Sequence, residues 1–293
     1  MKKMLKIIFI VIVALVVLFV GNFAFRIIFR KPSYKGEVVD LKVGDRIKDL
    51  RENFDPADLG LTLAWSDEFE GDKLDSTKWE PCPNYERADG GAKWEDEMVE
   101  LDGKGNLILK VGLNKDGKIA SSGVRTMTKD YRVLFEQAKG YFEIRTTLQN
   151  VPGYWAAFWL MSESVSNVGN GATDGAEIDI FESFDLKGGR INHALHWDGY
   201  GEDGRGLGEE SVHPEVYDGN YHTFGLLWAD DGYFFYIDGN LVKSIDNSWA
   251  NFPGSCQAPS YIKITTEVGT WAGYILKANL PDQIKVDYVR VYK

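Results

Sequence analysis

The sequence predicts an all-β domain, built as a two-sheet antiparallel jelly-roll sandwich with a concave face. From residue 61 onward, short runs rich in β-branched and aromatic residues alternate with turn signals. In that region no run longer than about ten residues shows convincing helical periodicity. The 31 glycines, 9 tryptophans and 14 tyrosines among 293 residues are typical of a turn-rich β-protein with many aromatic surfaces. Many antiparallel strands in one domain of this size pack as two sheets that can curve around a cleft.

The chain begins with an apolar segment that predicts a membrane anchor over residues 1–30. Ile7 to Phe25 is uncharged and almost wholly apolar, and basic residues flank it on both sides. Nineteen residues rising 1.5 Å each extend roughly 28 Å, which spans a bilayer core. We expect an uncleaved signal anchor that forms one transmembrane helix. A cleaved signal peptide is the alternative, although no good small-x-small site follows the segment. Charges at both ends leave the orientation open.

Residues 31–60 form a charged connector, expected to act as a spacer with at most one short helix or edge element. The β domain then occupies residues 61–293. Its expected strands lie at 63–69, 106–111, 140–148, 155–161, 176–184, 191–197, 221–228, 233–237, 261–268 and 284–292. Asp230–Gly232 and Asp238–Asn240 are strong hairpin turns.

Charge separates the N-terminus from the rest of the chain and narrows the class of partner. The whole chain has 33 basic and 44 acidic residues, a net charge of −11. Residues 1–35 hold seven of the basic residues and no acid, which leaves 26 basic against 44 acidic residues, or −18, in the remainder. The strongly negative net charge of residues 36–293 argues against nucleic-acid binding. It also disfavours a strongly anionic polysaccharide, unless a local basic groove binds it.

Gly175–Ser183 carries three carboxylates among residues of high strand propensity. Because side chains alternate along a strand, Glu177 and Asp179 share one face. A regular strand would turn Glu182 into the core, where an unpaired carboxylate is unfavourable. One extra residue between Asp179 and Glu182, a β-bulge, returns Glu182 to the acidic face, and bulges are common beside active sites. We therefore expect one row of three acids, here named the acid row.

Such a row has a chemical use. Cleavage of a glycosidic bond with retention needs two carboxyl groups roughly 5–5.5 Å apart, one as nucleophile and one as acid/base. A third carboxylate between them raises the pKa of a neighbouring carboxyl group and keeps one proton on the site. The alternatives are an exposed acidic strand face and a set of oxygen ligands for Ca²⁺. Catalysis is the favoured interpretation, because three adjacent carboxylates repel each other.

Glu-Ile-Asp-Ile-Phe-Glu at 177–182 resembles the signature of glycoside hydrolase family 16. The resemblance implies that Glu177 is the nucleophile, Asp179 assists it and Glu182 is the acid/base. The form with the extra Phe181 is similar to the bulged, laminarinase-like branch, which includes several galactanases. The resemblance also implies that the domain has the concanavalin A-like sandwich fold of this family. Further similar segments lie at 139–145, 155–160, where Ala156 replaces the usual Pro, and at 193–199, 221–224, 269–273 and 286–292.

Aromatic and polar residues are expected to line the cleft. A sugar ring stacks its C–H face on an aromatic side chain, although a large aromatic residue in a sandwich is more often core. Trp155 and Trp159 are four apart on one strand and so share a face. The resemblance places Trp94 and Glu97 at the negative subsites. The expected substrate contacts are Trp94, Glu97, Arg125, Trp155, Trp159, His196, Trp197, Glu267 and Trp271.

His193 and His196 are three apart, so on a regular strand they face opposite sides and do not share a zinc site. The resemblance implies that one of them forms a hydrogen bond near Glu182, and we choose His196. A structural histidine is the alternative.

The resemblance also implies one structural Ca²⁺, held by the carbonyls of Glu68 and Gly105 and by the side chain of Asp287. An exposed strand residue is the alternative for Asp287. The two cysteines, Cys82 and Cys256, favour one disulfide if the domain is exported, although both can equally be free and buried.

These observations predict a membrane-anchored, extracytoplasmic, retaining endo-β-glycanase, or a secreted one if the anchor is cleaved. A β-1,3-glucan such as laminarin is the expected substrate, with an agarose-like β-galactan as the alternative. Transglycosylation shares the covalent intermediate and stays open. A lectin-like binding domain without turnover is the alternative of another class. We expect no catalytic cofactor, a monomer, and specificity set by the loops at 84–93 and 197–215.

Overall fold

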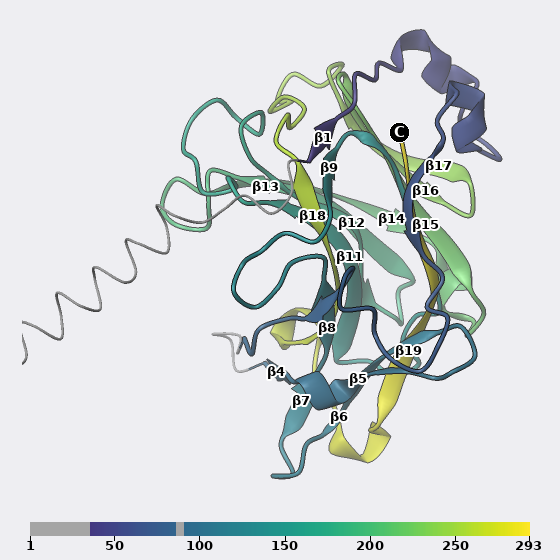
Figure 1. Ribbon diagram of the computed structural model, residues 1–293, viewed down its shortest axis with the longest axis vertical. Coiled ribbons are helices and arrows are strands. Elements are labelled where there is room, and N and C mark those ends of the chain that lie inside the picture. Colours follow the sequence, from purple (N-terminus) through teal and green to yellow (C-terminus); the bar gives the residue numbers. More distant parts are fainter. Residues whose placement is uncertain (1–35, 86–90) are drawn as a thin grey trace, which may run out of the picture. The chain divides into compact units, whose positions relative to one another are not determined.

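The computed structural model describes residues 36–85 and 91–293, which belong to one compact unit, Tyr34–Lys293 (Figure 1). The predicted anchor over 1–30 lies outside these residues. Within the described part of the chain, no helix has both the length and the apolar character needed to cross a bilayer.

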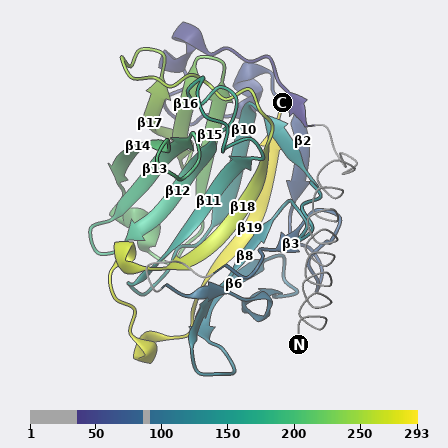
Figure 2. The same ribbon diagram turned by 90° about the vertical axis from the view of Figure 1, so that its left-hand side faces the viewer.

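Two sheets make up the domain, and the first of them carries the acid row (Figure 2). This nine-stranded sheet is antiparallel except for the β1–β9 pair. Its order is β1 (Glu37–Val38), β9 (Glu136–Ala138), β18 (Ser260–Val268), β11 (Tyr154–Ser162), β12 (Glu177–Asp185), β13 (Arg190–Trp197) and β14 (Arg205–Val212), with β8 (Gly123–Arg125) on β18 and β3 (Glu80–Pro81) on β8.

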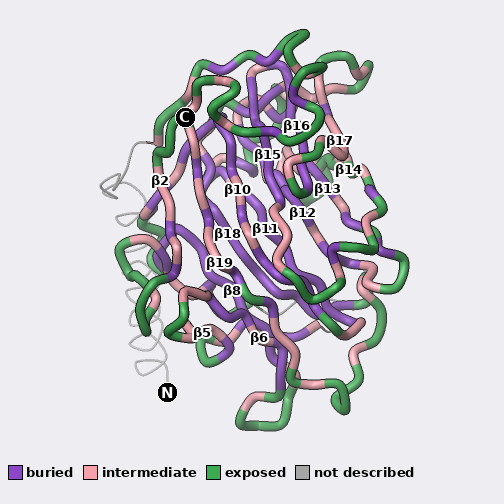
Figure 3. The backbone as a smooth tube through the Cα atoms, turned by 90° about the vertical axis from the view of Figure 1, so that its right-hand side faces the viewer, coloured by how far each residue is buried: buried purple, intermediate pink, exposed green. Residues whose placement is uncertain are grey.

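The second sheet has ten strands and covers the other side of the core (Figure 3). Its order is β17 (Asn240–Asp246), β16 (Gly232–Ile237), β15 (His222–Ala229), β10 (Gly140–Thr146), β19 (Asp282–Tyr292), β6 (Leu107–Leu113), β7 (Ile119–Ser121) and β4 (Lys93–Trp94), with β2 (Leu63–Asp67) on β19 and β5 (Val99–Leu101) on β6. Six 3-10 turns complete the described elements: η1 (Gly44–Lys48), η2 (Pro56–Leu59), η3 (Asp96–Met98), η4 (Pro214–Tyr217), η5 (Thr270–Ala272) and η6 (Lys277–Asn279). The predicted all-β, two-sheet jelly-roll sandwich is therefore confirmed.

The main core lies between the two sheets. Phe158 of β11 and Ile178 and Phe181 of β12 are fully buried there and share one cluster with Phe224 of β15. The rings of Phe181 and Phe224 are 4.2 Å apart between centroids. Burial of each such side chain contributes roughly 1.5–3 kcal/mol, so this cluster fixes which face of β12 points inward.

Residues 36–60, the described part of the expected connector, pack on the domain instead of acting as a free spacer. Their apolar side chains join the outer face of the second sheet in one cluster, which contains Leu41, Val43, Leu50, Phe54, Tyr141, Leu227, Phe234 and Tyr236. The carboxylate of Asp231 accepts hydrogen bonds from the backbone N–H groups of Val43 (3.1 Å) and Gly44 (2.6 Å). The segment is thus a structural layer of the domain, on the side away from the acid row.

The favoured disulfide is wrong, because both cysteines are free and buried. Cys82 belongs to the cluster of Trp94 and Trp155 on the cleft side of the first sheet, whereas Cys256 belongs to the core between the sheets. The first sheet therefore separates the two thiols.

Candidate active site

Strand β12 departs from regular pairing at the predicted position. Asp179 pairs with Ala194 and Glu182 with Asn192, so three steps on β12 match two steps on β13. The register with β11 shifts at the same place. One extra residue is therefore present between Asp179 and Glu182, and the predicted β-bulge is confirmed.

The bulge determines which side chains of β12 point to each face of the sheet. Ile180 and Phe181 are consecutive, yet both belong to the inner core. Glu177, Asp179 and Glu182 all line one cleft on the opposite face. The acid row predicted from the sequence is thus present in the structure.

The cleft has a volume of about 630 Å³ and lies across strands β8, β18, β11 and β12. Its lining residues are Pro83, Asn84, Tyr85, Trp94, Arg125, Tyr131, Ala157, Trp159, Met161, Glu177, Asp179, Glu182, Tyr200, Lys263 and Glu267. A hollow of about 610 Å³, here named the Glu97 hollow, shares Pro83 and Asn84 with it. A hollow of about 470 Å³ over β13 and β14, here named the Gly206 hollow, shares Tyr200 with it. The three adjoining spaces suit an extended polymer better than a small ligand.

Glu182 is held by two donors from the neighbouring strands. Nε1 of Trp155 donates a hydrogen bond of 3.2 Å to Oε1, and Nδ2 of Asn192 donates one of 2.9 Å to Oε2. Trp155 belongs to β11 and Asn192 to β13, so the carboxyl group is fixed from both sides. Asn192 did not emerge from the sequence, because only the strand register brings it opposite Glu182.

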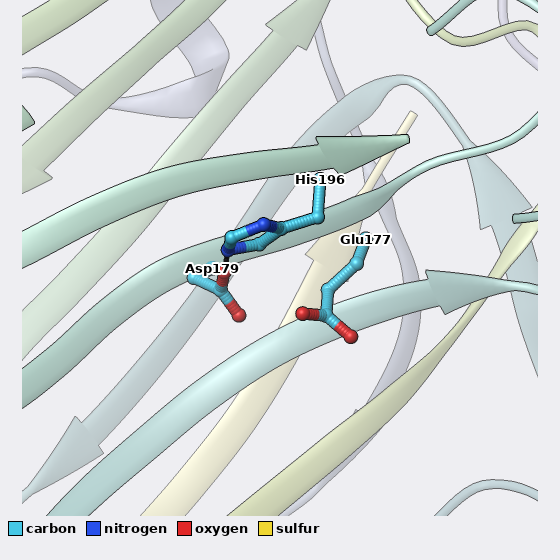
Figure 4. A group of neighbouring side chains, drawn as sticks. All are labelled: Glu177, Asp179 and His196. Atoms are coloured by element: carbon cyan, nitrogen blue, oxygen red, sulfur yellow. Dashed lines mark ion pairs between the residues drawn. The ribbon is translucent and has the colours of Figure 1, made fainter. Parts of the chain in front are cut away.

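The other two acids each have one partner on or after β13. Nε2 of His196 lies 3.5 Å from Oδ2 of Asp179, and Figure 4 shows both side chains turned toward each other, with Glu177 beside them. The hydroxyl of Tyr200 donates a hydrogen bond to Oε2 of Glu177. His196 was expected beside Glu182, so that detail is wrong.

Burial and mutual repulsion change the acidity of the site. Burial raises the pKa of Glu182 to about 7, assisted by the charges of Glu267 and Glu177 and opposed by the hydrogen bond from Asn192. Burial also raises the pKa of Asp179 well above its usual range, with further contributions from Glu177 and Glu182. A carboxyl group with a pKa near 7 can donate and accept a proton at neutral pH, which suits an acid/base.

Two cations line the cleft opposite each other on adjacent strands. Arg125 of β8 pairs with Lys263 of β18, and both side chains are more than nine-tenths buried. Arg125 donates to the carbonyls of Met127 (3.0 Å) and Thr128 (2.6 Å). The ammonium of Lys263 has no hydrogen-bond or ion-pair partner among residues 36–85 and 91–293; it lies 3.5 Å from the ring centroid of Trp159. Like charges placed directly opposite are unfavourable, and the carboxylates of Glu177 and Glu267 in the same cleft partly offset the two cations.

The predicted tryptophans have different environments. Trp94 and Trp159 line the cleft, as expected. Trp155 shares the cleft-side cluster with Trp159 but is only 2% exposed, so it offers no face to a sugar and instead holds Glu182. Trp271 is 43% exposed and stacks on Phe184 at 4.4 Å, outside the cleft lining.

The prediction that Trp197 contacts the substrate is wrong, because its side chain packs against the inner core. Alternation along β13 places His196 on the cleft side and Trp197 on the other. His193 is also on the inner side, where its ring nitrogens bond to the Ile180 carbonyl (2.7 Å) and the Ser211 hydroxyl (3.0 Å). It is the structural histidine of the pair.

The predicted polar contacts lie in the cleft or in the two hollows that adjoin it. Arg125 and Glu267 line it directly, and Glu97 lines the adjoining Glu97 hollow. The exposed aromatic rings in the cleft belong to Tyr85, Tyr131 and Tyr200, which the sequence did not single out. They come from loops and turns, where no periodicity indicates the direction of a side chain.

The expected calcium ligands are only partly suited to a cation. A Cβ added to Gly105 would lie 3.9 Å from the carbonyl oxygen of Glu68, so these two backbones are close. The carboxylate of Asp287, however, forms an ion pair of 2.5 Å with Arg145. The guanidinium of Arg145 already neutralises Asp287, the only expected side-chain ligand. Binding of Ca²⁺ therefore stays a prediction.

Comparison with known proteins agrees with the family resemblance found in the sequence of the acid row. A family model described as "Beta-porphyranase A-D, GH16 domain" matches residues 61–293. Over 267 residues the chain is 27% identical to glucan endo-1,3-beta-glucosidase A1 of Niallia circulans, covering 82% of this chain and 39% of that protein. Over 249 residues it is 28% identical to the keratan-sulfate endo-1,4-beta-galactosidase of Sphingobacterium multivorum, covering 79% of this chain and 55% of that protein. It thus spans about two-fifths to just over half of these relatives.

Among solved structures, the laminarinase catalytic domain of Thermotoga maritima MSB8 is similar, with a TM-score of 0.63 and 25% identity over 80% of this chain and 98% of that one. The fold, the bulged acid row and the match over 61–293 agree, and the chain belongs to glycoside hydrolase family 16.

Proposed function

We propose that the protein is a retaining endo-β-glycanase. In the first step Glu177 attacks the anomeric carbon, the glycosidic C–O bond breaks, and the leaving oxygen takes the proton of Glu182. In the second step Glu182 removes a proton from water, whose oxygen displaces the carboxylate of Glu177 from the anomeric carbon. The observation that carries this proposal is the acid row itself, in which Glu182 is half-buried, accepts two hydrogen bonds and has its pKa raised to about 7.

We infer that the substrate is a β-galactan that carries anionic groups such as sulfate. The Arg125–Lys263 pair supports this, because it places two buried cations in the cleft of an otherwise acidic domain. The matching family model is that of the β-porphyranases, and one relative is a keratan-sulfate galactosidase. The domain as a whole is acidic and would repel an anionic polymer, but these two cations provide a local basic site that can bind it.

A neutral β-1,3-glucan is the second candidate. The relative from Niallia circulans is a glucan endo-1,3-beta-glucosidase, and the Thermotoga maritima structure is a laminarinase. A polymer without charged groups would gain nothing from the Arg125–Lys263 pair, which makes this candidate the weaker one.

A reducing-end assay over keratan sulfate, porphyran, agarose and laminarin tests both substrate candidates. The expected result is cleavage of an anionic galactan at least tenfold faster than cleavage of laminarin, since a hydrogen bond to a charged group contributes about 1.5–3 kcal/mol. Glu177→Ala and Glu182→Gln should each abolish cleavage. Retained cleavage by either variant rejects the role given to that residue, and binding without cleavage by the wild type indicates a lectin.

We further propose that the domain acts outside the cytoplasm, tethered by the apolar segment at 7–25. This rests on the sequence of that segment and on the expected polymeric substrate. Fractionation of cells that produce the full chain should place it with membranes; its recovery as a shortened soluble protein in the medium indicates cleavage instead.

A further inference from the structure

Tyr200 contacts the acid row but has no role in the two chemical steps of the proposed mechanism. It lies in the segment 198–204 between β13 and β14, and its ring borders both the cleft and the Gly206 hollow. Its hydroxyl is the only hydrogen-bond donor to the side chain of Glu177 among residues 36–85 and 91–293. Glu182, by contrast, has two donors.

The loop that carries Tyr200 is anchored at its base, although the side chain itself is 61% exposed. The N–H of Gly199 donates to the carbonyl of Val165 (2.8 Å), and Asp198 accepts from the N–H of Gly169 (3.0 Å). Asp198 and Gly199 both have left-handed backbone conformations, with φ of 60° and 74°. These contacts direct the next residue, Tyr200, back over the acid row.

The phenol is suited to act as a permanent donor. Although the residue as a whole is exposed, desolvation of its hydroxyl and the neighbouring charge of Glu177 raise the pKa of Tyr200, so the hydroxyl keeps its proton at neutral pH. Its bond is made to Oε2 of Glu177, and Oε1 has no donor within the described residues.

We propose that Tyr200 is a positioning residue that orients Glu177 and stabilises its carboxylate as the glycosyl-enzyme breaks down. This inference rests on the proposed retaining mechanism. Oε1 forms the bond to the anomeric carbon, while Oε2 keeps the hydrogen bond from Tyr200. When water displaces the sugar, the electron pair of the C1–Oε1 bond returns to the carboxylate, and the water proton goes to Glu182.

The two chemical steps should depend differently on this hydrogen bond. A donor binds a charged carboxylate more strongly than a neutral ester carbonyl. The carboxylate of Glu177 is charged before the first step and becomes charged again in the second. Loss of the hydroxyl therefore slows breakdown of the glycosyl-enzyme more than its formation, and the covalent intermediate accumulates.

Tyr200→Phe tests the proposal, because it removes the hydroxyl and keeps the ring that borders the cleft. With the full chain and the polymer that the wild type cleaves best, kcat should fall about tenfold or more, and KM should fall with it. Acid-quenched mass spectra of the intact protein should show a glycosyl adduct in the variant that is weaker in the wild type. Tyr274→Phe is the matched control, since Tyr274 is 89% exposed and lines neither the cleft nor its two adjoining hollows.

An unchanged kcat, or a loss of kcat without adduct, overturns the role of Tyr200 while the proposed function stands. A rise in KM at constant kcat also overturns it, because that result describes a substrate contact only. A wild type that cleaves no glycan, or cleavage retained by Glu177→Ala, overturns the proposed function and this inference together. Thermal unfolding of Tyr200→Phe separates these outcomes from misfolding.

Discussion

Asn192 and Glu182 face each other across β13 and β12, and the amide of Asn192 donates a hydrogen bond of 2.9 Å to Oε2 of the carboxyl group. The bond opposes the effect of burial, which raises the pKa of Glu182 to about 7. The first chemical step needs the protonated acid. Activity should therefore fall as the pH rises through about 7.

Asn192→Ala removes a contribution that lowers the pKa of Glu182. The basic limb of kcat/KM against pH should move upward by on the order of 0.5–1 pH unit, whatever the loss in the maximum rate. Exposed Asn247→Ala serves as the control. An unmoved basic limb in Asn192→Ala would show that another group sets it.

Asp179→Asn should make the folded protein more stable at neutral and alkaline pH. The pKa of Asp179 is raised above its unfolded value by burial and by its two acidic neighbours. The stabilising proton is bound at low pH and is lost as the pH rises through the folded pKa. The amide keeps the shape without a charge, so the free energy of unfolding at pH 8 should rise by on the order of 1–2 kcal/mol, with little change at pH 4.

Denaturant unfolding at the two pH values measures this difference, and cleavage should decrease in the same variant. A variant less stable than the wild type at pH 8 would mean that Asp179 and His196 attract each other more strongly than the acids repel.

Lys263→Met should change substrate preference. Methionine retains an apolar stem beside Trp159 but carries no charge. We expect kcat/KM on a sulfated galactan to fall tenfold or more, and on neutral agarose or laminarin by less than about threefold. The control is exposed Lys104→Met. An equal loss on charged and neutral polymers would assign Lys263 a structural role only.

Phe54→Ala should weaken the attachment of the segment 36–60. Phe54 is buried and stacks on Tyr236 at 4.7 Å, with the ring of Tyr141 edge-on at 4.8 Å. Its truncation should lower the free energy of unfolding by about 3 kcal/mol, as measured by denaturant titration. Exposed Leu63→Ala should have little effect. Because Phe54 lies on the face of the second sheet away from the cleft, cleavage below the unfolding transition should be retained; its loss would reveal a link between the two faces.

Local patterns predicted most of the fold. Strands such as β11, β12 and β18 alternate or are rich in β-branched and aromatic residues, so their positions could be read directly. The bulge followed from one energetic argument, the unfavourable burial of Glu182. Strand β14, Arg205–Val212, lies within the segment 197–215 that we predicted to be a loop, and its two glycines and two glutamates give a weak strand signal. As the last strand of its sheet it depends on backbone pairing with β13, which propensity does not record.

The site was less predictable, because most of its contacts join distant parts of the chain. Asn192, Tyr200 and Lys263 reach the acid row or the cleft only through strand order and loop shape. One error was avoidable: His196 and Trp197 are neighbours on one strand, and alternation alone excludes both from the same face.

The single extra residue in β12 also constrains how the sequence can change. Upstream of it, odd-numbered residues point toward the sugar side; downstream, even-numbered residues do, as the acids at 177, 179 and 182 show. If the same residues formed a regular strand without the bulge, this parity would be inverted after Asp179, which would turn Ser183 outward and Glu182 into the apolar interior. The bulge therefore keeps Glu182 on the sugar side and out of the core at the same time, and only a deletion of one of the two residues between Asp179 and Glu182 would make it dispensable, because regular alternation would then leave Glu182 on the sugar side.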